Sequence, residues 1–317
     1  MPLTVDALGC TSSPVAHEVD SRWLMAYAAS VGALDDVYLN RRRDDGIVGH
    51  PLFPVCVEWP AVLAMRDLLT GYGLTREEAG RGVHLRHDLR LGRLVRPGDQ
   101  LTTVATVVGM TTHRAGVLLD LDLVTTDRDG LTVAATRMGT LYRDVELRGP
   151  DQAPPPLRPT TGQPRDLLDS TEPAQPADPA DPVSVRHAID GGAAHMYTEC
   201  SRIWNPIHTD ARTAARAGLP GIILHGTATL AFAVNHVLHQ TSAHPTEVRR
   251  LQVRFGATVS LPSSIDLRLL GWSAKDHTAW FDAIGTSGTP VLRHGTIVFG
   301  PAESTGAHDG GQGVSHA

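Results

Sequence analysis

The sequence predicts an α+β protein made of two similar halves, in each of which a curled antiparallel sheet wraps a central helix. The first observation is a repeated order of elements: a short helical segment, a longer apolar segment of helical length, and then β-rich sequence, twice along the chain. The second is a proline-crowded stretch at residues 149–182, which separates the two copies. With 317 residues, the chain has room for two domains of about 150 residues, each large enough for its own core.

The N-terminal half is expected to span residues 15–148. It opens with a helical segment at residues 21–31, and its central helix is predicted over residues 55–69. Strand-like sequence then follows at residues 84–91, 100–109, 115–125 and 131–142. Between the last two strands, Asp127-Arg128-Asp129-Gly130 is typical of a hairpin turn.

The C-terminal half is expected to span residues 183–300, with a first helix at residues 193–202 and a central helix at residues 226–238. Small and apolar residues cover nearly every side of that central segment, as in a helix that is buried all round. Strands are predicted at residues 248–255, 265–272, 278–286 and 291–299. A turn at residues 285–290 would join the last two strands.

Local matches between the halves favour a duplication. Residues 94–101 occupy the place that residues 259–266 occupy in the second half, and residues 31–40 align with residues 201–210 without a gap. Two unrelated α+β domains are the alternative explanation of the pattern.

The segments between and after the halves have a different composition. Residues 149–182 hold ten prolines among Asp, Gln and Thr, so they cannot bury enough apolar surface to fold alone and are predicted to form a semi-extended linker. Residues 301–317 are rich in Gly, Ser and His, and we expect a disordered tail there.

Composition excludes several classes of function. The chain has 28 basic and 34 acidic residues, a net charge of -6, whereas a protein that follows nucleic-acid phosphates is usually basic. No apolar run approaches the roughly 20 residues that cross a bilayer. Because the first ten residues contain no basic side chain, they do not resemble a secretion signal, and we expect a cytoplasmic protein with neither nucleic-acid nor membrane partners.

Common cofactor and metal motifs are not found in the sequence. It contains no glycine-rich phosphate loop and no G-x-S-x-G elbow, so nucleotide and serine-hydrolase chemistry have no support. The three cysteines fit neither a disulfide framework nor a zinc site. His236 and His239 lie three apart on a predicted helix, but no acidic or thiol partner accompanies them, so no metal is expected.

The densest polar cluster of the chain lies at residues 197–210. Because a residue that precedes proline is disfavoured in helical geometry, the preceding helix should end by Asn205, before Pro206. His208 then falls on a tight turn, where its side chain can point into a cleft.

A second short motif, Leu224-His225-Gly226-Thr227, leads into the buried central helix. The backbone N–H groups at Gly226 would be free there and aligned with the positive end of the helix dipole. Such groups could hold a developing oxyanion, for instance on a thioester carbonyl.

These motifs resemble the MaoC-like, or (R)-specific enoyl-CoA hydratase/dehydratase, family. Its signature reads roughly G-D-x-N-P-[LIV]-H, then a short helix, then H-G before the central helix. Asn205-Pro206-Ile207-His208 and His225-Gly226 match it, and residues 31–38 look like the degenerate N-terminal hotdog domain of members with two such domains. The resemblance implies a double hotdog fold in which the two sheets join edge to edge and an acyl-thioester tunnel lies between the halves.

The resemblance also implies a hydro-lyase that hydrates or dehydrates 3-hydroxyacyl/2-enoyl thioesters of coenzyme A or acyl carrier protein. His208 would be the acid/base and the Gly226 N–H the oxyanion donor, while Asn205 would shape the turn. No organic cofactor or metal is expected, because the thioester itself is the electron sink. Whether two chains form a homodimer is left open, as are the carrier, the chain length and the direction of reaction.

One departure from the family pattern affects the chemistry. The family's aspartate position is Ile203 here and the glycine before it is Arg202, while Ala33 and Tyr38 occupy the Asp and His positions of the first half. Isoleucine can neither accept a proton nor orient a water, so two-group acid–base catalysis needs a carboxylate from elsewhere. The candidates, none of which is singled out by spacing, are Glu199, Asp210, Asp35, Asp36 and Glu58.

Four residues near the motifs are candidates for substrate binding, each with a structural alternative. Arg202 could meet a substrate carboxylate or phosphate or be a solvated surface charge. Trp204 could form a wall of the acyl pocket or simply pack. His225 could touch substrate or satisfy backbone groups at the helix entry, and Asp210 could bind substrate or cap the next helix.

Two other functions remain compatible with the missing aspartate. One is double-bond isomerisation or intramolecular hydroxyl addition (a cyclase) on a thioester in a biosynthetic tailoring pathway, where His208 alone could move the proton. The other is a non-catalytic acyl-binding subunit.

Overall fold

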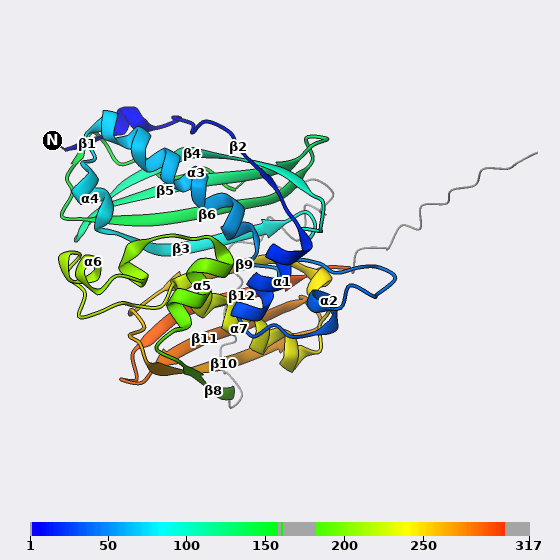
Figure 1. Cartoon of the computed structure of the whole chain (residues 1–317). Coiled ribbons are helices and arrows are strands. Elements are labelled where there is room, and N and C mark those ends of the chain that lie inside the picture. Colours follow the sequence, from blue (N-terminus) through cyan, green and yellow to red (C-terminus); the bar gives the residue numbers. More distant parts are fainter. Residues whose placement is uncertain (1, 158–159, 161–181, 302–317) are drawn as a thin grey trace, which may run out of the picture.

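The computed structural model describes residues 2–157, 160 and 182–301. Within these residues, the main sheet has ten strands in the order β2-β4-β5-β6-β3-β9-β12-β11-β10-β8, and its neighbouring strands are antiparallel. β3 (Gly82–Leu91) and β9 (Val248–Phe255) pair at its centre and join the two halves. The two sheets therefore meet edge to edge, as predicted (Figure 1).

Each half of the sheet curls around one long helix. The other strands of the first half are β2 (Val15–Glu18), β4 (Gln100–His113), β5 (Gly116–Asp127) and β6 (Thr132–Arg143), and its central helix is α3 (Pro54–Leu69). Those of the second half are β8 (Val183–Ile189), β10 (Ser263–Ser273), β11 (Thr278–Gly285) and β12 (Pro290–Phe299), and its central helix is α7 (Gly226–Thr241). Both predicted central helices and all eight predicted strands are confirmed, with ends that differ by a few residues.

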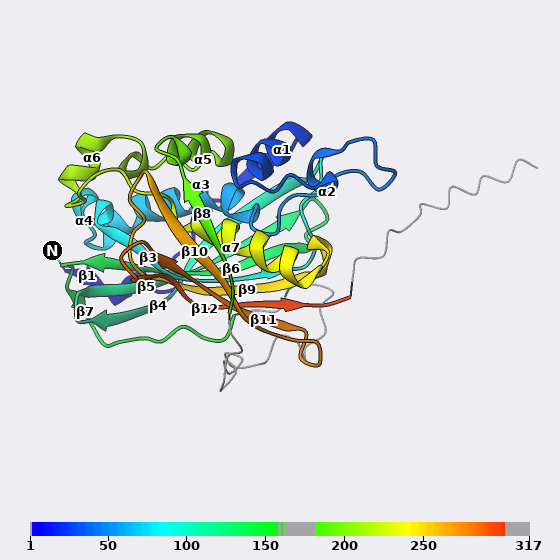
Figure 2. The ribbon, with the colours of Figure 1, turned by 90° about the horizontal axis from the view of Figure 1, so that it is seen from below.

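Shorter elements complete the described chain. The remaining helices are α1 (Ser21–Ser30), α2 (Asp36–Leu39), α4 (Arg76–Gly80), α5 (Ala193–Ser201) and α6 (Ala211–Arg216). The 3-10 helices are Val5–Ala7, Thr70–Tyr72, Pro206–His208 and Pro245–Glu247, and β1 (Leu3–Thr4) forms a small parallel pair with β7 (Leu147–Arg148). Figure 2 shows the labelled helices together on one side of the sheet. None of the helices in the described part of the chain is both long and apolar enough to span a membrane.

The sequence explains why α7 forms the centre of its half. All sides of the helix carry small or apolar residues, and most of them from Ala228 to Leu238 are buried. The predicted hairpin turns also form: Gly130 adopts a φ of +77° and Gly288 a φ of +74°, values that glycine tolerates without steric cost.

Side-chain hydrogen bonds join the two halves in addition to the backbone pairing of β3 with β9. Arg250 Nε and Nη2 donate to the two carboxylate oxygens of Asp88 at 2.9 and 2.8 Å. On the helix side, Asn235 of α7 accepts from His50 Nε2 at 2.9 Å and donates from Nδ2 to the carbonyl of Val31 at 2.8 Å. Both bonds of Asn235 connect the second half to the first, so the halves share one interior.

The expected linker and tail lie mostly outside the described residues, which end at 157 (except for 160) and resume at 182, and stop at 301. Residues 149–157 are described, and they contact the first half. Gln152 exchanges two backbone hydrogen bonds with Met110 of β4, at 2.9 and 2.8 Å, and the carbonyl of the buried Leu157 accepts from Arg90 at 2.9 Å. The start of the proline-rich stretch therefore packs on the sheet.

Candidate active site

A cavity of about 230 Å³ lies between the two halves. From the first half it is lined by residues of α3 and β3, among them Val55, Glu58, Val62, His84 and His87. From the second half it is lined by the turn after α5, the start of α7 and the end of β9, including Asn205, His208, His225, Gly226 and Phe255. Four residues of the two sequence motifs thus line one cavity: Asn205, His208, His225 and Gly226.

His208 is held in one tautomer by a backbone carbonyl. It belongs to the 3-10 helix Pro206–His208, and Asn205 before it has the extended conformation (φ −121°, ψ 112°) that a following proline favours. Nδ1 lies 2.8 Å from the carbonyl oxygen of Ile223, so Nδ1 carries the proton and donates. Nε2 is left unprotonated, and it has no hydrogen-bond partner within the described residues. Burial lowers the pKa of His208 to about 4, so the ring is a neutral base at pH 7.

His225 stacks directly on His208. The two ring centroids are 3.6 Å apart with an interplanar angle of 23°. Burial, and then the proximity of His208, hold the pKa of His225 well below its usual range, so both rings are neutral together. Nε2 of His225 lies 3.4 Å from the carbonyl of Ile203 and from the hydroxyl of Thr198. This ring therefore fixes one face of His208 and helps to exclude water from it.

Gly226 begins α7 beside these two rings. As the first helical residue, its N–H has no partner inside the helix, and it makes no other hydrogen bond within the described residues. A Cβ at this position would lie 3.0 Å from two ring carbons of Phe255, so glycine lets that ring close against the helix start. A free N–H at a helix N-terminus, backed by an aromatic wall, can stabilise negative charge on a carbonyl oxygen.

Three of the predicted substrate-binding residues lie outside the cavity. Arg202 adopts a left-handed conformation (φ 60°), and its guanidinium carbon lies 3.9 Å from the ring centroid of Trp23. Trp204 is 58% exposed. The carboxylate of Asp210 caps α6, accepting from the Arg212 N–H at 3.0 Å and from the Thr213 hydroxyl at 2.6 Å. None of the three is among the residues that line the cavity, and their contact with substrate stays a prediction.

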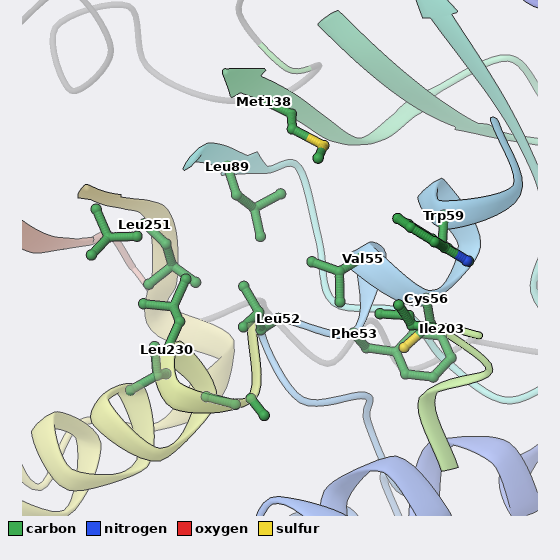
Figure 3. Close-up of a cluster of buried hydrophobic side chains, with 14 of the residues drawn as sticks. Leu52, Phe53, Val55, Cys56, Trp59, Leu89, Met138, Ile203, Leu230 and Leu251 are labelled. Atoms are coloured by element: carbon green, nitrogen blue, oxygen red, sulfur yellow. The ribbon is translucent and has the colours of Figure 1, made fainter. Parts of the chain in front are cut away.

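Only one of the carboxylates that could replace the missing aspartate lines the cavity in the described structure. Ile203 is 6% exposed and lines the cavity, and Figure 3 shows it among buried side chains from the start of α3, including Val55 and Cys56. Four of the five candidates, Asp35, Asp36, Glu199 and Asp210, are exposed. Among the residues that the structure describes, Glu58 is the only Asp or Glu that lines the cavity.

Glu58 is a buried carboxyl group with a single hydrogen bond. It is 2% exposed, and the hydroxyl of Thr136 on β6 donates to Oε1 at 2.6 Å. Burial raises the pKa of Glu58 to about 8, against a smaller opposite effect of the Thr136 hydrogen bond. At neutral pH, Glu58 is therefore mainly a protonated acid.

Residues 170–283 match the family model of the MaoC-like domain, and residues 6–136 match the model of a FAS1-like dehydratase domain region. The second half therefore matches a MaoC-like dehydratase domain, and the first half matches a FAS1-like dehydratase region. Both matches support a hydratase or dehydratase activity in general terms.

Several solved structures share the fold. A MaoC-like dehydratase from Phytophthora capsici has a TM-score of 0.72 and 19% identity, covering 93% of this chain and 97% of that one. The peroxisomal multifunctional enzyme type 2 of Drosophila melanogaster has a TM-score of 0.69 and 21% identity over 92% of this chain, which spans 48% of the enzyme. A Mycobacterium tuberculosis protein described as having a double hotdog fold has a TM-score of 0.56 and 18% identity, covering 92% of this chain and 96% of that one. No curated protein sequence matches this MaoC-like chain.

The first half of this MaoC-like protein has no open site at the place equivalent to His208. Tyr38, which the internal alignment matches with His208, is 2% exposed, and its ring centroid lies 5.8 Å from that of His50. His50 in turn lies 5.7 Å from the fully buried ring of Tyr27. Aromatic side chains thus fill that region. The motif residues that line the cavity between the halves come from the second half.

Sequence reasoning did not identify several polar residues of the cavity wall. His84 and His87 of β3 line it, with ring centroids 5.3 Å apart, and burial lowers the pKa of His87 to about 4. Arg66 and Arg143 line it as well. Glu58 was already one of the candidate carboxylates, and a further signal could have singled it out, since it is the only charged residue between positions 54 and 65 of an otherwise apolar helical segment.

Metal ligation has no support from the cavity. Within the described residues, no group of three or more His, Cys, Asp or Glu side chains could hold a metal ion. His236, one of the two histidines with a spacing compatible with metal, instead lies 3.0 Å from the carbonyl of Val183 through Nε2.

Proposed function

We propose that this protein hydrates 2-enoyl thioesters, or dehydrates 3-hydroxyacyl thioesters, of coenzyme A or acyl carrier protein. The observation that carries this function is His208: a neutral imidazole with Nε2 unprotonated, in a largely apolar cavity that also contains the N-terminus of α7. A base beside an oxyanion donor is the arrangement that proton abstraction next to a carbonyl requires.

Each part of the arrangement has a step to perform. The Gly226 N–H donates to no other group within the described residues, so it is free to donate to the thioester carbonyl oxygen, where negative charge develops. His208 Nε2 would take the C2 proton in dehydration and return it in hydration. Because the thioester accommodates the charge as an enolate, the reaction needs no metal or organic cofactor.

The experiment is hydration of a panel of trans-2-enoyl-CoA esters from short to long chains, followed by loss of the enoyl absorbance. We expect turnover by the wild type and a loss of at least about 100-fold in His208→Ala, the usual contribution of a general base. His239→Ala, which removes an exposed histidine of α7, is the matched control and should retain full activity. Turnover by His208→Ala within a few-fold of the wild type would overturn the function.

A second candidate follows from Ile203, an apolar side chain on the cavity wall where the family pattern has an acid. An isomerase or hydroxyl-adding cyclase would use the same thioester pocket without handling water. If the wild type does not hydrate any ester but Ile203→Asp does, the pocket binds thioesters, and this tailoring role, or non-catalytic acyl binding, would be favoured.

A further inference from the structure

Glu58 lines the His208 cavity from the opposite half of the molecule. Its helix, α3, presents Val55, Glu58 and Val62 to the cavity, three positions that recur at helical spacing on one face. Burying a carboxyl group is costly unless it is hydrogen-bonded, and Glu58 has one bond, from Thr136 to Oε1. Oε2 makes no hydrogen bond within the described residues.

On the basis of the function proposed above, we propose that Glu58 is the second acid–base catalyst of the reaction. The N-terminal half would supply it in place of the family's aspartate, whose position is occupied by Ile203 here. Its position supports this role, because the other carboxylates near the motifs are exposed or cap a helix. The first half would then contribute chemistry as well as space for the acyl chain.

The protonation states of the two groups are complementary. The pKa of His208 is lowered to about 4 and that of Glu58 is raised to about 8, both by burial. Between these values His208 is a free base and Glu58 carries a proton, which is the state that elimination of water requires. Two titratable groups whose surroundings move their pKa values apart are a recurrent feature of acid–base sites.

The step balances without any further reactant. In dehydration, His208 Nε2 takes the C2 proton, the C2–H electron pair forms the C2=C3 bond, and the C3–O bond breaks. The leaving hydroxyl takes the proton of Glu58 and departs as water, leaving an imidazolium and a carboxylate. A proton passed from the imidazolium to the carboxylate, through water, restores the starting state, and hydration is the reverse sequence.

Glu58→Gln tests this role while keeping the side-chain shape and an oxygen for the Thr136 hydrogen bond. Two reactions are compared: dehydration of a 3-hydroxyacyl-CoA, and deuterium exchange at C2 of the saturated acyl-CoA of equal length, which has no hydroxyl to lose. We expect Glu58→Gln to lose about 100-fold or more in dehydration and to retain C2 exchange. His208→Ala should lose both, and Glu77→Gln, which alters an exposed glutamate of α4, should lose neither.

The possible outcomes separate the two ideas. If Glu58→Gln dehydrates within a few-fold of the wild type, or loses exchange and dehydration equally, Glu58 is not the acid, although His208-dependent exchange would still support thioester chemistry. If the wild type exchanges C2 protons but never eliminates water, the acid role is also overturned. If no thioester undergoes exchange, the proposed function itself fails and this inference fails with it.

The pH profile provides an independent readout if Glu58→Gln folds poorly. For the wild type, kcat/KM of dehydration should fall above about pH 8, where Glu58 loses its proton. Thr136→Val removes the hydrogen bond that lowers the pKa of Glu58, so this alkaline limb should move to higher pH. A limb that stays at the same pH in Thr136→Val would contradict the assignment to Glu58.

Discussion

At the residue scale, the burial that makes Glu58 an acid also makes it a cost to the folded protein. Its pKa is raised from an ordinary value near 4.5 to about 8, so the folded state keeps a proton that the unfolded chain releases above pH 4.5. The stability that this proton contributes is complete below pH 4.5 and is lost as pH rises through 8. Catalytic side chains often carry such a cost.

We therefore predict that Glu58→Gln stabilises the protein, and does so more at high pH. The gain in the free energy of unfolding should be about 3 kcal/mol at pH 7 and below about 1 kcal/mol at pH 5, because glutamine has no proton to lose. Urea unfolding at pH 5, 7 and 8 measures it. Glu77→Gln, at an exposed position, should give no pH-dependent difference. An equal gain at all three pH values would show that Glu58 does not titrate abnormally.

The residue scale also shows what sequence could and could not predict about the site. Asn205 and His208 form one turn, and His225 and Gly226 form one helix entry, so their relation could be inferred from local spacing. Glu58 could be named as a candidate but not chosen, because its approach to the cavity depends on the pairing of β3 with β9. Arg202, Trp204 and Asp210 are neighbours of the motif in sequence, yet they are not among the residues that line the cavity.

At the element scale, the central helices and inner strands were predictable, whereas the edge strands were not. β4, β5 and β6 are flanked by neighbours on both sides and carry long apolar patterns. β2 and β8 lie at the two edges of the main sheet, where each pairs with one strand. β8 is mostly exposed, and β2 alternates between half-buried and exposed side chains over only four residues, so neither has an alternating pattern long enough to predict a strand.

α7 is tied to the first half by Asn235, which no sequence pattern indicated. Its amide accepts from His50 Nε2 and donates to the carbonyl of Val31, both in the other half. His50 is 1% exposed, and its Nδ1 already accepts from the Leu52 N–H, which fixes the proton on Nε2. Loss of the amide would leave the His50 Nε2–H donor and the Val31 carbonyl without this hydrogen-bond partner.

Asn235→Ala should lower the free energy of unfolding by about 2–4 kcal/mol, since each buried polar group left unsatisfied costs about 1–3 kcal/mol. Chemical denaturation followed by tryptophan fluorescence measures the change. The matched control is Asn40→Ala, which removes an exposed hydrogen bond to Asp36 within one helical turn and should cost less than about 0.5 kcal/mol. Equal, small effects of both substitutions would show that Asn235 does not stabilise the contact between the halves.

At the scale of the whole molecule, two similar halves have taken different roles around one cavity. In the first half, Tyr38 and its aromatic neighbours fill the place that His208 occupies in the second. The first half instead contributes the cavity-facing sides of α3 and β3. Because residues from both halves line the same space, the site exists only when the β3–β9 pairing is formed.

The distribution of histidines has a consequence for the stability of the whole protein. Burial is the largest cause of a lowered pKa for seven histidines in the described part of the chain, and the pKa is lowered most for five of them: His50, His84, His87, His208 and His225. A lowered pKa means that the folded state resists a proton that the unfolded chain binds below about pH 6.5. The stability contributed by these neutral rings is therefore present above pH 6.5 and is lost as pH falls toward 4.

We predict that the free energy of unfolding decreases steeply between pH 6.5 and pH 4.5, by roughly 2 kcal/mol at pH 5 for each of His50, His87 and His208, whose pKa is lowered to about 4. Urea denaturation at half-unit pH steps gives the slope, which counts the protons taken up on unfolding. His87→Leu should reduce that slope by about one proton, because both ring nitrogens of His87 are buried without a hydrogen-bond partner in the described structure. His239→Ala, at an exposed position, should leave the slope unchanged. A stability that stays level down to pH 4.5 would mean that these rings accept protons in the folded state, and His208 would then be too exposed to act as the neutral base proposed here.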